Sequence, residues 1–276
     1  MRKNLISMIK TASKKEAERD IAEEFKNDWV YCNENSEKSH PASKTLSPSS
    51  MQCQRMMSCK LLSVPKSEVK SNFSLNMICE IGSCIHAYTQ KHCLDLKKFT
   101  YVNVADYVKE KNLPLEVGKE SDFEHGEYET HLYALDENGN RIISFLCDGI
   151  LKDNVSGKYI ILELKSCGSS GFFKMDNVLP KHYNQAIAYS ILLDIPSVLF
   201  VYINRDIPAL KPFIFTATKE QKQELKDKWD LVISKAKENI ILPKEPNVSK
   251  NICSYCDWRK FCNKIGDGEY QYDSVI

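Results

Sequence analysis

The chain carries CDGIL at residues 147–151 and IILELKS at residues 160–166, two apolar runs that each contain charged side chains. The stretch between them, KDNVSGK, is rich in turn-forming residues and predicts a hairpin that joins two β-strands. Side chains alternate between the faces of a strand, so Glu163 and Lys165 should point one way and the neighbouring leucines into the opposite packing layer. Burying charges in this way is costly unless they pair or bind a metal ion.

Three charged residues of these segments, Asp148, Glu163 and Lys165, indicate a metal-dependent phosphodiesterase site. Hard divalent cations bind carboxylate oxygens, and a nearby ammonium group can assist the cleavage of a phosphate ester. A Glu-x-Lys pair by itself is more often an exposed strand edge or a cross-strand ion pair. The functional interpretation therefore depends on the segments that accompany it.

Two flanking segments add polar side chains to this set. Downstream, PKHYNQAIAY begins a helix predicted from Pro180 to about Leu193, which places Gln185 and Tyr189 on one face. Both side chains can bind phosphate oxygens or hold a neighbouring lysine; the alternative is that they lie at the rim of an amphipathic helix. Upstream, EIGSCIHAY begins a helix that carries His86. A lone histidine is usually structural, although neutral imidazole is a competent manganese ligand.

The order of these motifs resembles the PD-(D/E)XK nuclease superfamily. Gly82 and His86 match the Gly-x-x-x-His segment of its RecB-like branch, and Gln185 and Tyr189 match the Gln-x-x-x-Tyr motif that follows Glu-x-Lys there. The resemblance covers about residues 45–265. It implies an α/β, restriction-endonuclease-like fold in which helices flank a mixed β-sheet.

The same resemblance implies a Mg²⁺- or Mn²⁺-dependent deoxyribonuclease, an exonuclease that hydrolyses phosphodiester bonds at single-stranded DNA ends. The implied metal ligands are His86, Asp148, Glu163 and the backbone carbonyl of Leu164. The implied catalytic residues are Asp148, Glu163, Lys165, Gln185 and Tyr189. Lys165 is expected to position water or stabilise the reacting phosphate, while Gln185 and Tyr189 orient Lys165 and the strand. Glu127 and Glu129 are candidates for an outer carboxylate, with a solvent-facing role favoured for both.

Cysteines form the second pattern in the sequence. Eleven occur in a chain that shows no apolar leader, so a reducing, cytoplasmic compartment is expected (the host cytoplasm if the protein is phage-encoded), and disulfides are disfavoured. Cys253, Cys256 and Cys262 form a compact trio that can direct thiolates at one centre. A tetrahedral zinc ion or a cubane iron–sulfur cluster requires a fourth ligand. Cys53 is the candidate, and Cys59 is the second choice.

One distant N-terminal cysteine together with this trio, around a RecB-like core, resembles the iron–sulfur exonucleases. These comprise the CRISPR-associated exonuclease family, AddB-type nuclease modules and related phage exonucleases. The resemblance implies a [4Fe–4S] cluster held by Cys53, Cys253, Cys256 and Cys262, with structural Zn²⁺ as the alternative. Gln54 stands where the family has a proline after the first ligand. The implied partners are single-stranded DNA ends and proteins of recombination, repair, replication or CRISPR adaptation.

Composition and charge set outer limits on the fold and its partners. The chain has 276 residues, 42% of them hydrophobic, which is enough for one substantial core and a small satellite. No uninterrupted run of apolar residues is long enough to span a membrane, so no membrane partner is expected. With a net charge of +1, a DNA-binding surface must come from local clustering. Candidates for such a patch are Lys60, Lys165, Lys174 and Lys181. The alternative is that these lysines are dispersed over the surface and exposed to solvent.

The rest of the chain divides into a charged helix and linker (residues 1–44), the nuclease domain (45–265) and a tail (266–276). Residues 1–28 are expected to form the charged helix, with a narrow apolar stripe at Ile21, Phe25 and Trp29 that packs on a neighbour. The other predicted helices are 65–96 and 218–239, the latter capped by Thr218. The predicted strands are 128–135, 141–151, 159–165, 197–204 and 211–218, and residues 31–50 and 168–171 are predicted loops.

Two other functional classes remain open from the sequence. One is a DNA-binding or assembly module that keeps the fold without cleavage, which a complete set of Asp, Glu, Lys and His disfavours. The other is a zinc-binding interaction protein, which explains the cysteines but leaves Asp148, Glu163 and Lys165 without a role.

Overall fold

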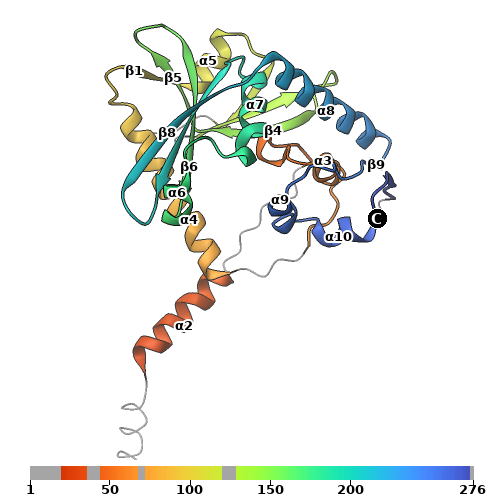
Figure 1. Ribbon diagram of the computed structural model, residues 1–276, viewed down its shortest axis with the longest axis horizontal. Coiled ribbons are helices and arrows are strands. Elements are labelled where there is room, and N and C mark those ends of the chain that lie inside the picture. The colour runs from red at the N-terminus through yellow and green to blue at the C-terminus, as the bar shows by residue number, and fades with distance from the viewer. Residues whose placement is uncertain (1–19, 36–43, 68–71, 120–128, 274–276) are drawn as a thin grey trace, which may run out of the picture. The chain divides into compact units, whose positions relative to one another are not determined.

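A computed structural model of this protein describes residues 20–35, 44–67, 72–119 and 129–273 (Figure 1). These residues divide into two compact units, a small one made of 20–35 and 72–80 and a large one that holds the others. All the residues identified above as candidates for the active site or the cysteine site belong to the large unit. The predicted boundaries after residues 44 and 265 stay predictions.

The large unit contains a five-stranded sheet in the order β1–β5–β6–β7–β8. Its strands are β1 (Phe99–Val102), β5 (Gly149–Asp153), β6 (Tyr159–Cys167), β7 (Ser197–Asn204) and β8 (Ala209–Thr216). Strands β5 and β6 form the predicted antiparallel hairpin. Strands β6 and β7 pair in parallel, and the remaining neighbours are antiparallel, so the sheet is mixed. A parallel pair needs a crossover, which here contains α6 (Ser169–Lys174), η2 (Pro180–His182) and α7 (Tyr183–Leu192).

A second, antiparallel sheet precedes this one along the chain. It consists of β2 (Leu115–Lys119), β3 (Thr130–Leu135) and β4 (Arg141–Cys147), in that order. The prediction of one strand over residues 141–151 is therefore wrong, because β4 and β5 belong to different sheets and Asp148 lies between them. The break has a physical cause: the Asp148 carbonyl accepts side-chain hydrogen bonds from Gln90 and Tyr101.

Helices cover both faces of the five-stranded sheet, so the predicted α/β class with a flanked mixed sheet is confirmed (Figure 1). On one face, Ile150 and Ile161 join a core shared with α7 and with α8 (Lys219–Lys237). On the other face, Leu162 and Leu164 pack with Cys93 at the end of α4 (Phe73–Cys93). The leucines beside Glu163 thus lie in the layer opposite to it, as the alternation of β6 predicts.

Several local predictions hold and several are wrong. Thr218 caps α8 through a capping box with Gln221, as predicted. The helix expected over residues 65–96 is shorter and begins at Phe73. The loop expected over residues 168–171 is instead the start of α6, because burial of Phe172 stabilises a helix that Gly and Ser alone disfavour. Elements absent from the predictions are α3 (Gln54–Leu61), η1 (Pro48–Ser50), β1, α5 (Val104–Glu110), β2 and the short helices and strands that follow residue 239.

A satellite core holds the cysteine-rich end of the chain to residues that lie far earlier in the sequence. Cys59 and Val64 pack with Ile241 and Trp258, and the Trp258 indole donates a 2.8 Å hydrogen bond to the Val64 carbonyl. The elements of this lobe are α3, β9 (Ile240–Ile241), α9 (Lys250–Ser254), α10 (Arg259–Lys264) and β10 (Tyr270–Gln271). We refer to it as the cysteine lobe.

The small unit contains α2 (Ile21–Glu34) and the first eight residues of α4. The predicted stripe packs only in part: Ile21, Phe25 and Trp29 are all exposed, although Trp29 meets Phe73 edge-on at 6.2 Å between ring centroids. The helix runs six residues beyond its predicted end, and the predicted part before residue 20 lies outside the described residues. None of the helices in the described ranges has the length and apolar character needed to cross a membrane.

Candidate active site

Asp148 is held in place from both its backbone and its side chain. Its carbonyl accepts hydrogen bonds from Gln90 Nε2 at 2.8 Å and Tyr101 Oη at 2.9 Å. Its carboxylate accepts a 2.6 Å bond from the Leu164 backbone N–H on the neighbouring β6. Glycine at residue 149 leaves room for the Tyr101 ring, because a Cβ there would lie 2.6 Å from it. The chain therefore passes from one sheet to the other at Asp148 and Gly149, and the buried Asp148 carboxylate points toward β6.

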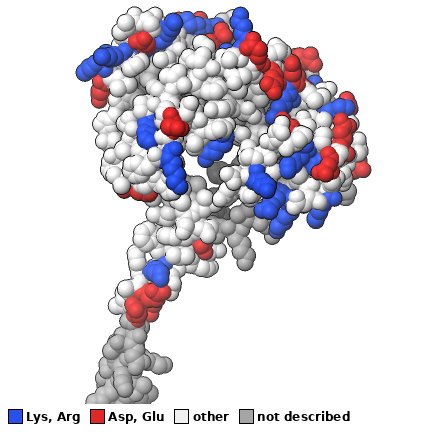
Figure 2. Space-filling view, viewed as in Figure 1, with Lys and Arg blue, Asp and Glu red and all other residues white. Residues whose placement is uncertain are grey.

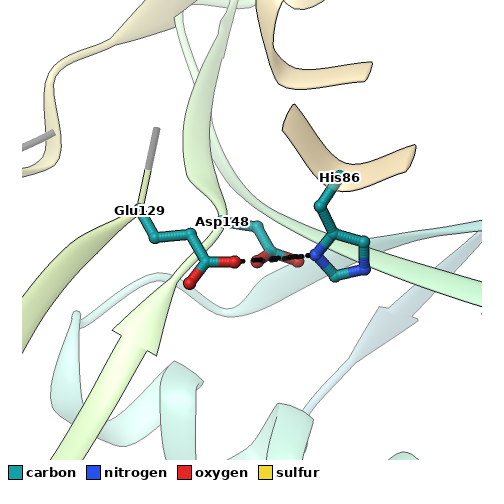
Figure 3. A group of neighbouring side chains, drawn as sticks. All are labelled: His86, Glu129 and Asp148. Carbon is teal, nitrogen blue, oxygen red and sulfur yellow. Dashed lines mark ion pairs between the residues drawn. The ribbon is translucent and has the colours of Figure 1, made fainter. Parts of the chain in front are cut away.

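His86 from α4 meets two carboxylates at this point (Figure 3). Its Nδ1 lies 3.6 Å from Asp148 Oδ1 and 3.6 Å from Glu129 Oε1. One potential ligand atom from each of the three residues lies within 4.8 Å of the others. One imidazole and two carboxylates from three separate segments of the chain therefore surround a single point.

The approach of α4 to the sheet depends on a small residue one turn before His86. A Cβ at Gly82 would lie 3.2 Å from Ser166 Oγ on β6, which is tighter than ordinary van der Waals contact. The Gly-x-x-x-His spacing thus has a structural reason, since glycine allows the helix close enough for His86 to reach Asp148.

A second polar group lies on β6 and α7. Lys165 Nζ is 2.5 Å from Glu163 Oε1, and Gln185 Nε2 donates a 2.7 Å hydrogen bond to the same oxygen. Gln185 also bonds Tyr189 Oη at 3.1 Å, and Tyr189 donates to the Leu146 carbonyl at 3.0 Å. The alternation of β6 and the i, i+4 spacing of α7 thus bring all four side chains into one connected network.

The carboxylates and the cations in this site alter one another's protonation. Burial raises the pKa of Glu163, and the Asp148 charge raises it further, while Lys165 opposes both effects. Burial lowers the pKa of Lys165, but Glu163 outweighs that effect and the net shift is upward, so the ammonium stays charged. Burial also lowers the pKa of His86, but Asp148 and Glu129 outweigh it and raise the pKa to about 10. A cation bound here must therefore displace the His86 proton.

The site brings together the described side chains that the sequence singled out, including one for which another role was favoured. Asp148 and His86 form the potential metal group, while Glu163, Lys165, Gln185 and Tyr189 form the adjoining network. Glu129, for which a solvent-facing role was favoured, instead faces His86. Its place in the sequence could have identified this role. Glu129 directly precedes β3, and β3 pairs with β4, the strand that leads to Asp148. Glu127 lies outside the described residues.

Five cysteines line a separate cavity in the cysteine lobe, of about 330 Å³. They are Cys53, Cys59, Cys253, Cys256 and Cys262, which include all four predicted cluster ligands. Burial raises the pKa of Cys59 to about 12, and the nearby Cys256 and Cys262 add to the shift. Cys53 differs from Cys59 in its position, because it is the residue that precedes the first turn of α3.

A buried arginine accompanies these cysteines. Arg55 is 2% exposed, and its guanidinium donates to the carbonyls of Leu242, Gly266 and Gly268. It also donates to Cys262 Sγ at 3.5 Å. The partners described for this guanidinium therefore include a sulfur atom and no carboxylate. A buried cation without an anion is costly, and the Cys262 sulfur is the described hydrogen-bond partner of this guanidinium that a metal or cluster could share.

Solved structures similar to this chain were found at low sequence identity. The crystal structure of SSO0001 is 14% identical, with a TM-score of 0.42, over 83% of this chain and 91% of that one. LHK-Exo in complex with dAMP is 12% identical, with a TM-score of 0.43, over 71% and 89%. An alkaline exonuclease (LHK-Exo) from Laribacter hongkongensis is 11% identical, with a TM-score of 0.42, over 76% and 92%.

No protein-family model and no curated protein matches the chain. At these identities and TM-scores, the structural similarities carry no inference about activity.

Proposed function

We propose that this protein is a divalent-metal-dependent nuclease that hydrolyses DNA phosphodiester bonds, acting as an exonuclease on single-stranded ends. One observation carries the proposal: the group formed by His86, Glu129 and Asp148 lies beside a buried Glu163–Lys165 ion pair. The two are linked because the Asp148 carboxylate accepts a hydrogen bond from the Leu164 backbone, between Glu163 and Lys165. A purely structural ion pair needs neither the histidine nor the two further carboxylates. Buried carboxylates placed together need compensating positive charge, which a bound divalent cation would supply in place of the His86 proton.

The donor set fits a hard divalent cation. Carboxylate oxygens are the preferred ligands of Mg²⁺ and Mn²⁺, and imidazole is more acceptable to Mn²⁺ than to Mg²⁺. His86, Asp148 and Glu129 would hold the ion, with Glu163 and the Leu164 carbonyl as further ligands. When bound, such an ion makes water nucleophilic near neutral pH and offsets charge that develops on the phosphate.

The remaining side chains have separate tasks in this proposal. Lys165 supplies a fixed positive charge for the phosphate oxygens, because Glu163 keeps it protonated despite its burial. Gln185 holds the Glu163 carboxylate in one orientation, and Tyr189 holds Gln185. Gln185 and Tyr189 are therefore positioning residues, since they act through Glu163.

For the cysteine lobe we propose a [4Fe–4S] cluster on Cys53, Cys253, Cys256 and Cys262. Two features support it: these sulfurs share one cavity, and Arg55 supplies a buried positive charge beside them. Cys53 is favoured over Cys59 because it precedes the first turn of α3 and stands two residues before Arg55, whose guanidinium reaches Cys262. Structural Zn²⁺ is the alternative occupant, since thiolates suit both.

The test is a cleavage assay with end-labelled single-stranded and double-stranded DNA. Asp148→Asn, Glu163→Gln and Lys165→Met should each lower the rate by roughly 100-fold or more, because each removes charge from the reacting centre. EDTA should abolish cleavage, and Mg²⁺ or Mn²⁺ should restore it.

Matched controls are Asp230→Asn and Lys226→Met on the exposed face of α8, which should cleave at the wild-type rate. Undiminished cleavage by Glu163→Gln would contradict the site assignment. Equal cleavage of linear and covalently closed circular single strands would identify an endonuclease and contradict the preference for ends.

A further inference from the structure

A cavity of about 880 Å³ connects the candidate active site to the cysteine lobe. Lys165 and Gln185 line it on the active-site side, and Asn251 and Tyr255 line it on the lobe side. Its volume lies toward the upper end of the range of roughly 300–1,000 Å³ that is common for ligand clefts. Lys165 and the cysteine lobe thus face one continuous space.

The described walls of this cavity carry positive charge and no carboxylate. Lys165 and Lys181 are the charged side chains that line it. His182 also lines it, and burial, followed by the Lys165 and Lys181 charges, lowers its pKa to about 3, so it adds no charge near neutral pH. The other lining residues are uncharged, and Gln52 among them donates to the Lys181 carbonyl at 2.5 Å. Such a wall suits a polyanion.

A neighbouring cavity of about 700 Å³ is lined by charges of both signs, with carboxylates in the majority. It shares Gln52 and Lys181 with the first one, but Lys228, Glu224, Asp227 and Glu245 also line it, and Lys228 pairs with Glu245 at 2.7 Å. Its three carboxylates against two lysines make this cavity less favourable for a phosphate backbone than the cationic cavity, which leads from Lys165 toward the cysteine lobe.

Tyr255 stands at the lobe end of the cationic cavity and is 90% exposed. It lies between Cys253 and Cys256, where the Cys256 N–H bonds the Cys253 carbonyl in a tight turn. The aromatic ring is therefore presented to solvent from a short, constrained loop. An exposed aromatic ring beside cationic walls is the arrangement with which proteins bind unpaired bases, because every base has a face that can stack.

The surface around Tyr255 is also cationic. Lys250, Arg259, Lys260 and Lys264 are exposed on α9 and α10, with Asp257 as the one carboxylate between residues 250 and 264. In Figure 2, Lys and Arg side chains predominate over this part of the surface.

We propose that the cationic cavity is the groove for a single DNA strand, in which Tyr255 stacks on an unpaired base and Lys181 contacts a phosphate. The inference rests on the proposed nuclease function and adds to it how the strand is gripped. A base paired within a duplex has both faces covered by its neighbours, so stacking on Tyr255 selects a single strand. Tyr255 sits on the cysteine turn, so the cysteine lobe acts as part of the substrate-binding surface.

Binding without cleavage tests the groove separately from the chemistry. Fluorescence anisotropy of a labelled 12-nucleotide single strand is measured in EDTA with the full-length protein. Tyr255→Ala should weaken binding by roughly 10-fold, whereas Tyr255→Phe should bind like the wild type, because stacking needs the ring and not the hydroxyl. The matched control is Tyr88→Ala, which removes another exposed ring that does not line the cavity.

The Lys181 contact has its own readout. Each phosphate neutralised on a single strand contributes about 0.7 to the slope of log Kd against log salt. Lys181→Ala should lower this slope by about 0.7, and Lys219→Ala, at the exposed start of α8, should leave it unchanged.

The outcomes separate the two proposals. Full-strength binding by both Tyr255→Ala and Lys181→Ala overturns the groove, even if the wild type cleaves DNA. A second outcome is that the wild type binds the strand but cleaves nothing with Mg²⁺ or Mn²⁺, while both variants lose binding. That result supports the groove and overturns the nuclease. Unchanged visible absorption and thermal unfolding of Tyr255→Ala would exclude damage to the cysteine lobe as the cause of lost binding.

Discussion

At the residue scale, the junction between the two sheets depends on Gly149. A side chain here would meet the Tyr101 ring at 2.6 Å, and Tyr101 also bonds the Asp148 carbonyl. Gly149→Ala should therefore destabilise the fold by about 1–3 kcal/mol, the usual cost of overpacking, and should also displace Asp148. Urea denaturation measures the first effect and the cleavage rate measures the second.

Gly171→Ala is the control for this substitution. Gly171 lies in α6 with open space around its Cβ position, so alanine should be neutral or slightly stabilising. Equal stability of Gly149→Ala and the wild type would show that the Tyr101 contact does not constrain the junction.

His182 gives a residue-scale prediction for pH. Its pKa is lowered to about 3 by burial, with Lys165 and Lys181 adding to the effect, and its Nδ1 lies 2.8 Å from Tyr202 Oη. The folded state therefore keeps His182 neutral, while the unfolded state takes up a proton below pH 6.5. The stability due to neutral His182 is complete above pH 6.5 and falls as the pH drops toward 3.

From pH 7 to pH 5, the free energy of unfolding of the metal-free wild type should fall by about 2 kcal/mol more than that of His182→Gln, because glutamine takes up no proton in the unfolded state. Urea titrations of both proteins at the two pH values give the difference. Parallel losses in the two proteins would show that His182 is protonated in the folded state.

At the element scale, α8 is stabilised where it begins. The Thr218 side chain accepts from the Gln221 N–H, and the Gln221 side chain accepts from the Thr218 N–H. Thr218→Ala should lower the free energy of unfolding by about 1 kcal/mol, and Thr218→Ser should retain most of it because the hydroxyl remains. Thermal unfolding of the three proteins checks this, and an alanine variant as stable as the serine variant would contradict the capping role.

At the scale of the whole molecule, the cysteine lobe joins distant parts of the chain. Cys53 and Cys59 face residues 253–262 in one cavity, and Arg55 bonds carbonyls as far along as Gly268. A cluster at this position closes a long loop, which restricts the unfolded chain as a cross-link does.

Anaerobically purified protein should accordingly be brown. Cys53→Ala, Cys253→Ala, Cys256→Ala and Cys262→Ala should each lose the visible absorption and about 2–4 kcal/mol of stability, by analogy with a cross-link. Cys79→Ala and Cys167→Ala, which replace cysteines that do not line this cavity, should behave like the wild type. A colourless protein with stoichiometric zinc would replace the cluster with a structural zinc site.

Local rules account for the part of the molecule that the sequence could predict. The alternation of β6 separates Glu163 and Lys165 from Leu162 and Leu164, and helical spacing puts Gln185 and Tyr189 on one face. These relations involve neighbours along the chain, so they can be read without the fold. Turn-forming residues likewise predict the hairpin between β5 and β6.

By itself, then, the sequence determined the class of fold, the β5–β6 hairpin and the chemical identity of most candidate site residues. Only the tertiary structure decided that residues 141–153 divide between two sheets at Asp148, that Glu129 faces His86, and that Tyr255 lines the same cavity as Lys165. The physical reason is that these features depend on contacts between segments far apart in the chain. Hydrogen bonds from Gln90 and Tyr101 hold the Asp148 junction, and neither donor lies near it in sequence.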